Sequence, residues 1–138
     1  MNELDAIVQQ LSPKFKDMGL RKTKLTWHKV KNDLTIVFSV QKSQYSSDTW
    51  YYSFGICLHE ISDGKTQSIG NCQIKYRVDQ IINGIQLTPE MITQLLERWD
   101  VLYGDMKKLR ICAVEGKLPG QCTIRAMRYL TSVNLSNL

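Results

Sequence analysis

The sequence predicts a single α+β domain over residues 1–138, in which an antiparallel sheet of about four strands packs against helices at both chain ends. Apolar residues recur at three- and four-residue steps in residues 4–18 and again in 91–114, which is typical of amphipathic helices. Between these segments, four short runs alternate apolar with polar residues, as half-buried strands do. The length of 138 residues suits one domain with its own hydrophobic core.

The first helix is expected in residues 4–18, where one apolar face recurs and Gly19 supplies a C-terminal stop. Pro13 lies inside this pattern and directly follows Ser12. Proline lacks the backbone N–H and its ring crowds the preceding turn, so a helix interior seldom tolerates it. We therefore expect either a kink at Pro13 or two short helices, the second capped by Ser12.

The alternating runs predict four strands, in residues 24–31, 34–41, 50–59 and 72–78. Asn32-Asp33 separates the first two strands, which indicates a hairpin. In the second strand every even-numbered residue is large and apolar, so that side is expected to face the core. Gly55, inside the third strand, indicates a bulge or the close approach of another backbone.

A second helical region follows the strands. Thr88-Pro89-Glu90 is expected to open it, because threonine can cap, proline suits the first turn and glutamate complements the exposed amides. The apolar stripe then continues past a weak point at Gly104, and Pro119-Gly120 stops it. A last helix is expected in residues 121–130.

The composition is that of an ordinary globular protein, with 43% hydrophobic and 22% charged residues. No apolar run approaches the ~18 residues that a membrane span needs. Residues 1–11 lack the basic-then-apolar order of a secretory signal. We therefore expect a cytoplasmic protein without a membrane partner. In that reducing compartment the four cysteines are expected to be free thiols.

The side chains that catalysis or metal binding would need are sparse. His28 and His59 are the only imidazoles, and no serine or cysteine lies in a recognisable nucleophile motif. Cys57 and His59 alone have metal-ligand spacing, whereas a structural zinc site needs about four ligands. We expect no catalytic, cofactor-binding or metal-binding residue. An enzyme with an unrecognised pocket around these three side chains is the third-ranked alternative.

Residues 34–58 hold the most informative feature, in which two strand-like runs flank a polar loop crowded with large rings. Tyr52 and, on one interpretation, Trp50 belong to the core, because aromatic rings carry large buried areas. On the other interpretation these rings are interface hot spots, since Trp, Tyr and Arg dominate the binding energy of protein interfaces. Lys42 is either a plain strand-end residue or part of that surface. The expected partner-binding residues are Arg21, Lys22, Lys42, Gln44, Tyr45, Trp50 and Tyr51.

The net charge of +5 is concentrated in the first 31 residues, which hold seven lysines and arginines against three acidic residues. A basic surface of this kind steers an acidic partner toward the protein. Cations beside aromatic rings also suit single-stranded nucleic acid, so an RNA- or single-stranded-DNA-binding domain is the alternative function. It ranks second, because the glycine-aromatic signature of an RNA-recognition sheet does not occur in the chain.

The first 60 residues combine a helix, a glycine followed by a hydrophobic residue, a basic turn, a strand pair ending in Gln-Lys-Ser, a loop and a strand with an internal glycine. In this respect the chain resembles a widespread bacterial family of domains of unknown function. The residues that carry the resemblance are Phe15, Gly19, Leu20, Arg21, Lys22, Trp27, Val37 to Ser43, Tyr45-Ser46 and Tyr52 to Ile56.

The resemblance also implies a function for this chain. Members of this type look like small cytoplasmic immunity proteins encoded beside polymorphic toxins. It implies a non-enzymatic inhibitor, monomeric in a 1:1 complex, that occludes the active site of a cognate toxin. Inhibitors of nuclease toxins are often acidic, whereas this chain is basic. The resemblance therefore implies a toxin with an acidic cleft, such as one that uses NAD or acts on protein.

Overall fold

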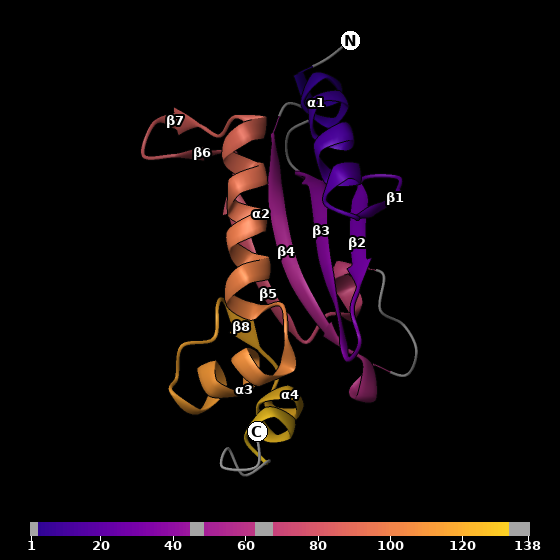
Figure 1. The fold of residues 1–138 in the computed structure, drawn as a ribbon. Helices are drawn as coiled ribbons and strands as arrows, with labels where there is room; N and C mark the ends of the chain where they lie inside the picture. The colour runs from indigo at the N-terminus through magenta and orange to yellow at the C-terminus, as the bar shows by residue number, and fades with distance from the viewer. Residues whose placement is uncertain (1–2, 45–48, 63–67, 133–138) are drawn as a thin grey trace.

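The computed structural model describes residues 3–44, 49–62 and 68–132. It is a mixed structure of four α-helices, two 3₁₀ turns and two antiparallel sheets (Figure 1). In chain order the elements are α1 (Glu3–Asp17), β1 (Arg21–Thr23), β2 (Thr26–Val30), β3 (Leu34–Lys42), β4 (Trp50–Leu58), η1 (His59–Ile61), η2 (Ile69–Asn71), β5 (Ile74–Asp79), β6 (Ile81–Ile82), β7 (Ile85–Gln86), α2 (Pro89–Tyr103), α3 (Met106–Val114), β8 (Gln121–Cys122) and α4 (Ile124–Thr131).

The main sheet has six strands in the order β1-β2-β3-β4-β5-β8, so the expectation of about four strands was too low. The four expected strands are its centre, and each pairs antiparallel with the next. The two additional strands are the edges, three and two residues long, which is too short for an alternating pattern to be visible. Strands β6 and β7 form a separate two-stranded sheet that projects from the body (Figure 1).

Helices α1 and α2 lie across the same face of the sheet, and α3 and α4 lie at one end of it (Figure 1). The apolar even-numbered residues of β3, from Leu34 to Val40, point toward these helices and are buried, as expected. Phe38 lies at the centre of an aromatic cluster, with ring centroids 5.1 Å from Phe15 and 5.2 Å from Phe54. Arg110 joins α3 to α4, because its guanidinium donates to the carbonyl oxygens of Tyr129 and Leu130 at 2.8 and 3.0 Å.

Helix α1 runs through Pro13 as one element, so of the two expected alternatives, a kink or two short helices, the second was wrong. The proline removes one backbone donor, yet Leu11 and Phe15 on either side of it are fully buried. Ser12 does not cap a second helix; its hydroxyl donates to the carbonyl oxygen of Val8 at 2.8 Å. Burial of the apolar face thus outweighs the local cost of the proline.

The second helical region begins as expected and ends earlier. The hydroxyl oxygen of Thr88 accepts a hydrogen bond from the backbone N–H of Met91 at 3.2 Å, which caps α2. The stripe does not continue past Gly104, where α2 ends. Asp105 instead caps the separate helix α3 by accepting from the backbone N–H of Lys108 at 2.8 Å. Among the helices that the structure describes, none combines the length and apolar character that would let it cross a membrane.

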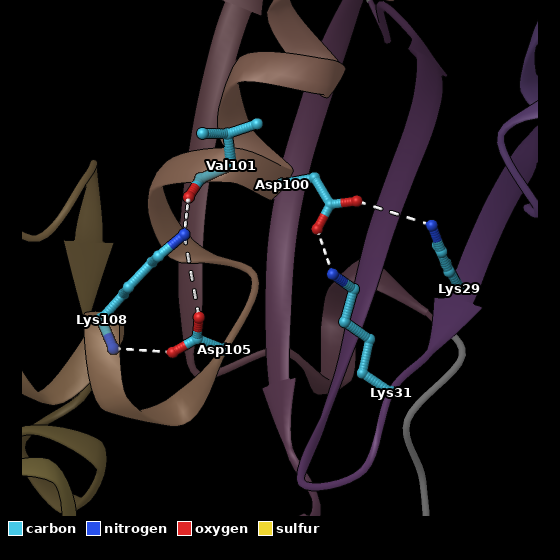
Figure 2. A network of polar contacts seen from close by, with 6 residues as sticks. All are labelled: Lys29, Lys31, Asp100, Val101, Asp105 and Lys108. Carbon is cyan, nitrogen blue, oxygen red and sulfur yellow. Dashed lines mark hydrogen bonds and ion pairs between the residues drawn. The ribbon is translucent and has the colours of Figure 1, made fainter. Parts of the chain in front are cut away.

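Asp100, near the end of α2, ties that helix to the β2–β3 hairpin (Figure 2). Its carboxylate accepts a hydrogen bond from the ammonium group of Lys31 and lies 3.6 Å from that of Lys29. The side chains are about a quarter to a third exposed, so solvent weakens the net attraction. We infer that the contact mainly sets the position of α2 on the sheet.

Gly55 lies in regular register between Val37 and Lys75, so β4 has no bulge at this position. A close approach does occur, by side chains from the segment around η2. An added Cβ would lie 2.7 Å from the Cys72 sulfur and 3.1 Å from Ile69 Cδ1. The glycine therefore allows this segment to pack against the sheet.

Replacing Gly55 by alanine is expected to destabilise the fold by about 1–3 kcal/mol, because the new methyl group overpacks a buried contact. The matched control is Gly70→Ala, where an added Cβ would meet nothing closer than 4.0 Å. Urea denaturation followed by circular dichroism measures both variants. Equal stability of the two variants would contradict the close approach at Gly55.

Candidate functional site

The helices cover one face of the main sheet, and the η2 segment covers part of the other, where Ile69 and Cys72 pack on Val37 and Cys57. The remaining part is uncovered by any described element and is called here the open face. It comes from three strands and consists of Gln41, Tyr51, Ser53, Lys75 and Arg77.

Tyr51 and Arg77 form the centre of the open face. The guanidinium carbon of Arg77 lies 4.5 Å from the centroid of the Tyr51 ring, a cation–π contact. The pair separates two hollows, and both residues line each of them. One hollow, of about 630 Å³, lies over the open face and reaches Gln121 on β8. The other, of about 640 Å³, lies toward the β3–β4 loop and reaches Gln44 and Asp79.

Hydrogen bonds hold the floor of both hollows. The hydroxyl of Ser53 donates to the side-chain oxygen of Gln41 at 2.8 Å, and Ser53 itself is buried. The backbone N–H of Trp50 donates to the side-chain oxygen of Gln80 at 2.8 Å. These hydrogen bonds fix the side chains of the surface in the free protein. Because they are preorganised, the entropy cost of binding a partner is lower. It offers hydroxyl, amide and cationic groups around one aromatic ring.

The structure brings together only some of the expected partner-binding residues. Tyr51 and Gln44 line the same hollow. Lys42 is exposed but pairs with Trp50, on the side of the sheet opposite Tyr51. Tyr45 lies outside the described residues.

Trp50 belongs to the core and not to the contact surface, because only 3% of it is exposed. Its indole N–H donates to the hydroxyl of Tyr52 at 2.9 Å, so the polar atom of the ring is satisfied internally. Of the two interpretations of these rings, the structure supports core packing for Trp50 and Tyr52, whereas Tyr51 is only half-buried.

Arg21 and Lys22 lie apart from the two hollows. They are on β1, the edge strand, which is three strand positions from β4, or roughly 14 Å at the usual spacing. Successive residues of a strand point to opposite faces, so the two cations do not act as one patch. Lys22 extends over the Trp27 ring, with its nitrogen 5.6 Å from the centroid. Electrostatic steering of a partner, the role expected for this basic turn, stays a prediction.

Lys75, Arg77 and Gln121 were not among the expected site residues, although they line the same hollow as Tyr51. The alternation in residues 72–78 already put Lys75 and Arg77 on one side of a strand. Their position opposite Ser53 and Gly55 depends on the strand pairing, which the sequence alone does not fix.

The two histidines lie on different elements, β2 and η1. His28 is buried on β2, and burial, followed by the nearby charge of Arg21, lowers the pKa of its imidazole. His59 Nε2 lies 2.7 Å from the hydroxyl oxygen of Thr35. Within residues 3–44, 49–62 and 68–132, no group of three or more His, Cys, Asp or Glu side chains is gathered where it could hold a metal ion.

All four cysteines are free thiols, and two of them are in contact. The sulfur atoms of Cys57 and Cys72 lie 2.8 Å apart beneath the η2 segment. The hydrogen bond between the two thiols, followed by burial, raises the pKa of the Cys72 thiol. Burial also raises the pKa of the partly exposed Cys112 and Cys122.

Because only an accessible thiolate is nucleophilic, we expect iodoacetamide at pH 8 to alkylate Cys112 and Cys122 slowly, and Cys57 and Cys72 only after unfolding. Mass spectrometry of peptides from native and urea-treated protein measures the difference. Alkylation of Cys72 in the native protein as fast as that of Cys112 would contradict the buried pair.

No curated protein matches the chain, and no solved structure does. A family comparison does match, over residues 11–111, which extends well beyond the 60 residues that carried the resemblance. The match runs from the second half of α1 into α3 and includes the open face strands β3, β4 and β5. The chain therefore belongs to the family described as Domain of unknown function (DUF4304).

Proposed function

We propose that this protein is a non-enzymatic immunity protein that binds a cognate bacterial toxin and occludes its active site. The observation that carries the proposal is the Tyr51–Arg77 pair at the centre of the open face. Tyrosine and arginine are the residue types most often found as binding hot spots. Here they stand on a sheet, between two hollows, with hydrogen-bonded side chains beneath them.

The charge of the open face favours an acidic partner surface. Lys75 and Arg77 line its hollow, and Asp79 is the acidic residue at the edge of the neighbouring one. A toxin whose cleft carries carboxylates would meet complementary charge at the centre and electrostatic steering from the basic β1 turn. Toxins that use NAD or act on protein remain our proposed targets.

The proposed complex contains one inhibitor chain for each toxin chain and forms in the cytoplasm. A preorganised surface of this kind binds its partner with little change of its own backbone. The inhibitor then needs no chemistry; it excludes substrate from the toxin by occupying the entrance to the cleft.

Binding of RNA or single-stranded DNA is the second candidate function, and one observation favours it. The Tyr51 ring is half-buried on the sheet, with a cation over it and Lys75 nearby. Bases stack on such rings, and cations follow the phosphates. The two candidates differ in salt dependence, because release of counterions weakens nucleic-acid binding steeply as salt rises.

A tagged pull-down from the native host, repeated after nuclease treatment, separates the two functions. We expect one dominant protein at about equal molar amount to the bait, retained after treatment and identified by mass spectrometry. Ribosomal proteins or nucleic acid that disappear on treatment would contradict the immunity function and support the alternative.

A further inference from the structure

A second surface, on the far side of α2 from the sheet, is apolar and uncovered by any described element. It is a groove of about 820 Å³ between α2 and the β6–β7 hairpin, called here the α2 groove. Five of the eleven exposed large hydrophobic residues of the described chain line it. They are Ile82, Met91, Leu95, Val101 and Leu102.

Helix α2 carries two apolar stripes. The first, at Ile92, Leu96 and Trp99, packs into the core. The second stripe begins at Met91 and repeats at Leu95 and Leu102. Met91 and Leu95 each precede a residue of the first stripe by one position, so the two stripes are about 100° apart around the helix axis. An ordinary surface helix has one such stripe, and a helix that is apolar over a wider arc is normally covered on both sides.

The β6–β7 hairpin gives a second reason to expect a cover. Asn83 and Gly84 form its turn with positive φ angles of 52° and 78°, as a tight hairpin of this kind requires. The adjacent residues Ile81 and Ile82 are 50% and 41% exposed, so both faces of the hairpin are open to solvent. An isolated two-stranded hairpin is only marginally stable in water, and another surface normally supports it.

We propose that the α2 groove binds a second copy of this chain, so that the protein is a two-fold symmetric dimer. The charges in the groove are one acid and one base, Glu97 and Arg98, adjacent on α2. A two-fold axis between the helices places Glu97 of each protomer within reach of Arg98 of its partner, giving the same pair twice. Both chains carry a net charge of +5, and a groove lined by one acidic and one basic side chain adds no further repulsion between them.

The dimer leaves the proposed toxin-binding surface free. Helix α2 lies on one face of the sheet and Tyr51 points to the other, so the two surfaces are back to back. Each protomer would keep its own open face, and a dimer would carry two toxin chains in place of the monomeric 1:1 complex. The dimer is a property of the free protein and does not depend on the identity of a toxin.

The first test measures the oligomeric state by sedimentation equilibrium at protein concentrations from about 1 to about 100 μM. Dissociation of an interface of ordinary size can be measured in this range. We expect a dimer for the native chain, and for Leu95→Asp a dissociation constant weaker by about a hundredfold, because a charge then enters an apolar contact. The matched control Ile124→Asp changes the most exposed apolar side chain, at 73%, on α4 and should leave the dimer intact.

The second test uses charge exchange between protomers. Glu97→Lys places two cations opposite each other twice in a dimer, and Arg98→Glu places two acids opposite each other twice. Each variant alone is expected to weaken dimerisation by about threefold to thirtyfold, as surface charge pairs do. Mixed in equal amounts, the two variants should form heterodimers with near-native affinity, because both charge pairs are then restored.

Only a symmetric contact between copies predicts recovery on mixing. A native chain that sediments as a monomer throughout the range overturns the proposal. So does a dimer that Leu95→Asp leaves unchanged while circular dichroism shows the variant to be folded. Charge variants that weaken the dimer but do not recover on mixing would overturn the reciprocal Glu97–Arg98 arrangement.

Discussion

Replacing Phe38 by alanine is expected to lower the free energy of unfolding by about 3–5 kcal/mol, the usual cost of removing a buried aromatic ring. Phe38 is fully buried, and its ring contacts four others. The centroid distances are 5.1 Å to Phe15, 5.8 Å to Trp27, 6.0 Å to Tyr52 and 5.2 Å to Phe54. The cluster joins α1 to three strands, so a cavity here weakens the contact between helix and sheet. Urea denaturation followed by tryptophan fluorescence measures the loss.

Two controls make the result specific for the cluster. Val114→Ala, at a side chain that is 50% exposed, should change the stability by less than about 0.5 kcal/mol. Phe38→Leu keeps most of the volume and should cost clearly less than the alanine variant. A loss below about 1.5 kcal/mol for Phe38→Ala would mean that the site collapses around the cavity, and that the cluster is not the centre of the core.

Replacing Tyr51 or Arg77 by alanine is expected to weaken partner binding by about tenfold to a hundredfold each, the range of interface hot spots. The two residues contact each other, so their effects should not add. The double variant is expected to lose less affinity than the sum of the free energies of the single variants. Isothermal titration with the purified partner measures all three variants.

The matched control is Arg98→Ala, which also removes an arginine side chain, but from the α2 groove instead of the open face. It should leave the affinity of each protomer for the toxin unchanged, because α2 lies on the other side of the sheet (Figure 1). Unfolding curves for all variants exclude loss of structure as the cause. Native affinity in both Tyr51→Ala and Arg77→Ala would remove the open face as the contact surface.

The central fold was predictable because its elements are long and strongly patterned. The strand β3 and the capped start of α2 both lie in the structure where the sequence indicated them. The β6–β7 hairpin was missed, although Asn83-Gly84 is one of the strongest short signals for a tight hairpin. Its strands are only two residues long, so no alternating pattern accompanied the turn.

The candidate site was only partly predictable, for a geometric reason. Trp50, Tyr51 and Tyr52 are neighbours in sequence, but strand alternation sends the first and third into the core and only the second to the open face. Grouping these rings by proximity therefore overstated the surface. Arg77 reaches Tyr51 through the pairing of β4 with β5, which are separated in sequence by a connection that contains η1 and η2. Such a pairing depends on tertiary packing and is not set by local sequence.

Protection of bacterial growth tests the central claim most directly. The partner recovered from the pull-down is produced in a bacterial host together with the native chain, with the double variant Tyr51→Ala/Arg77→Ala, or with Arg98→Ala at matched levels. We predict that the partner alone stops growth, that the native chain and Arg98→Ala restore it, and that the double variant does not. A partner without toxicity, or full protection by the double variant, would contradict the proposal that the open face neutralises a toxin.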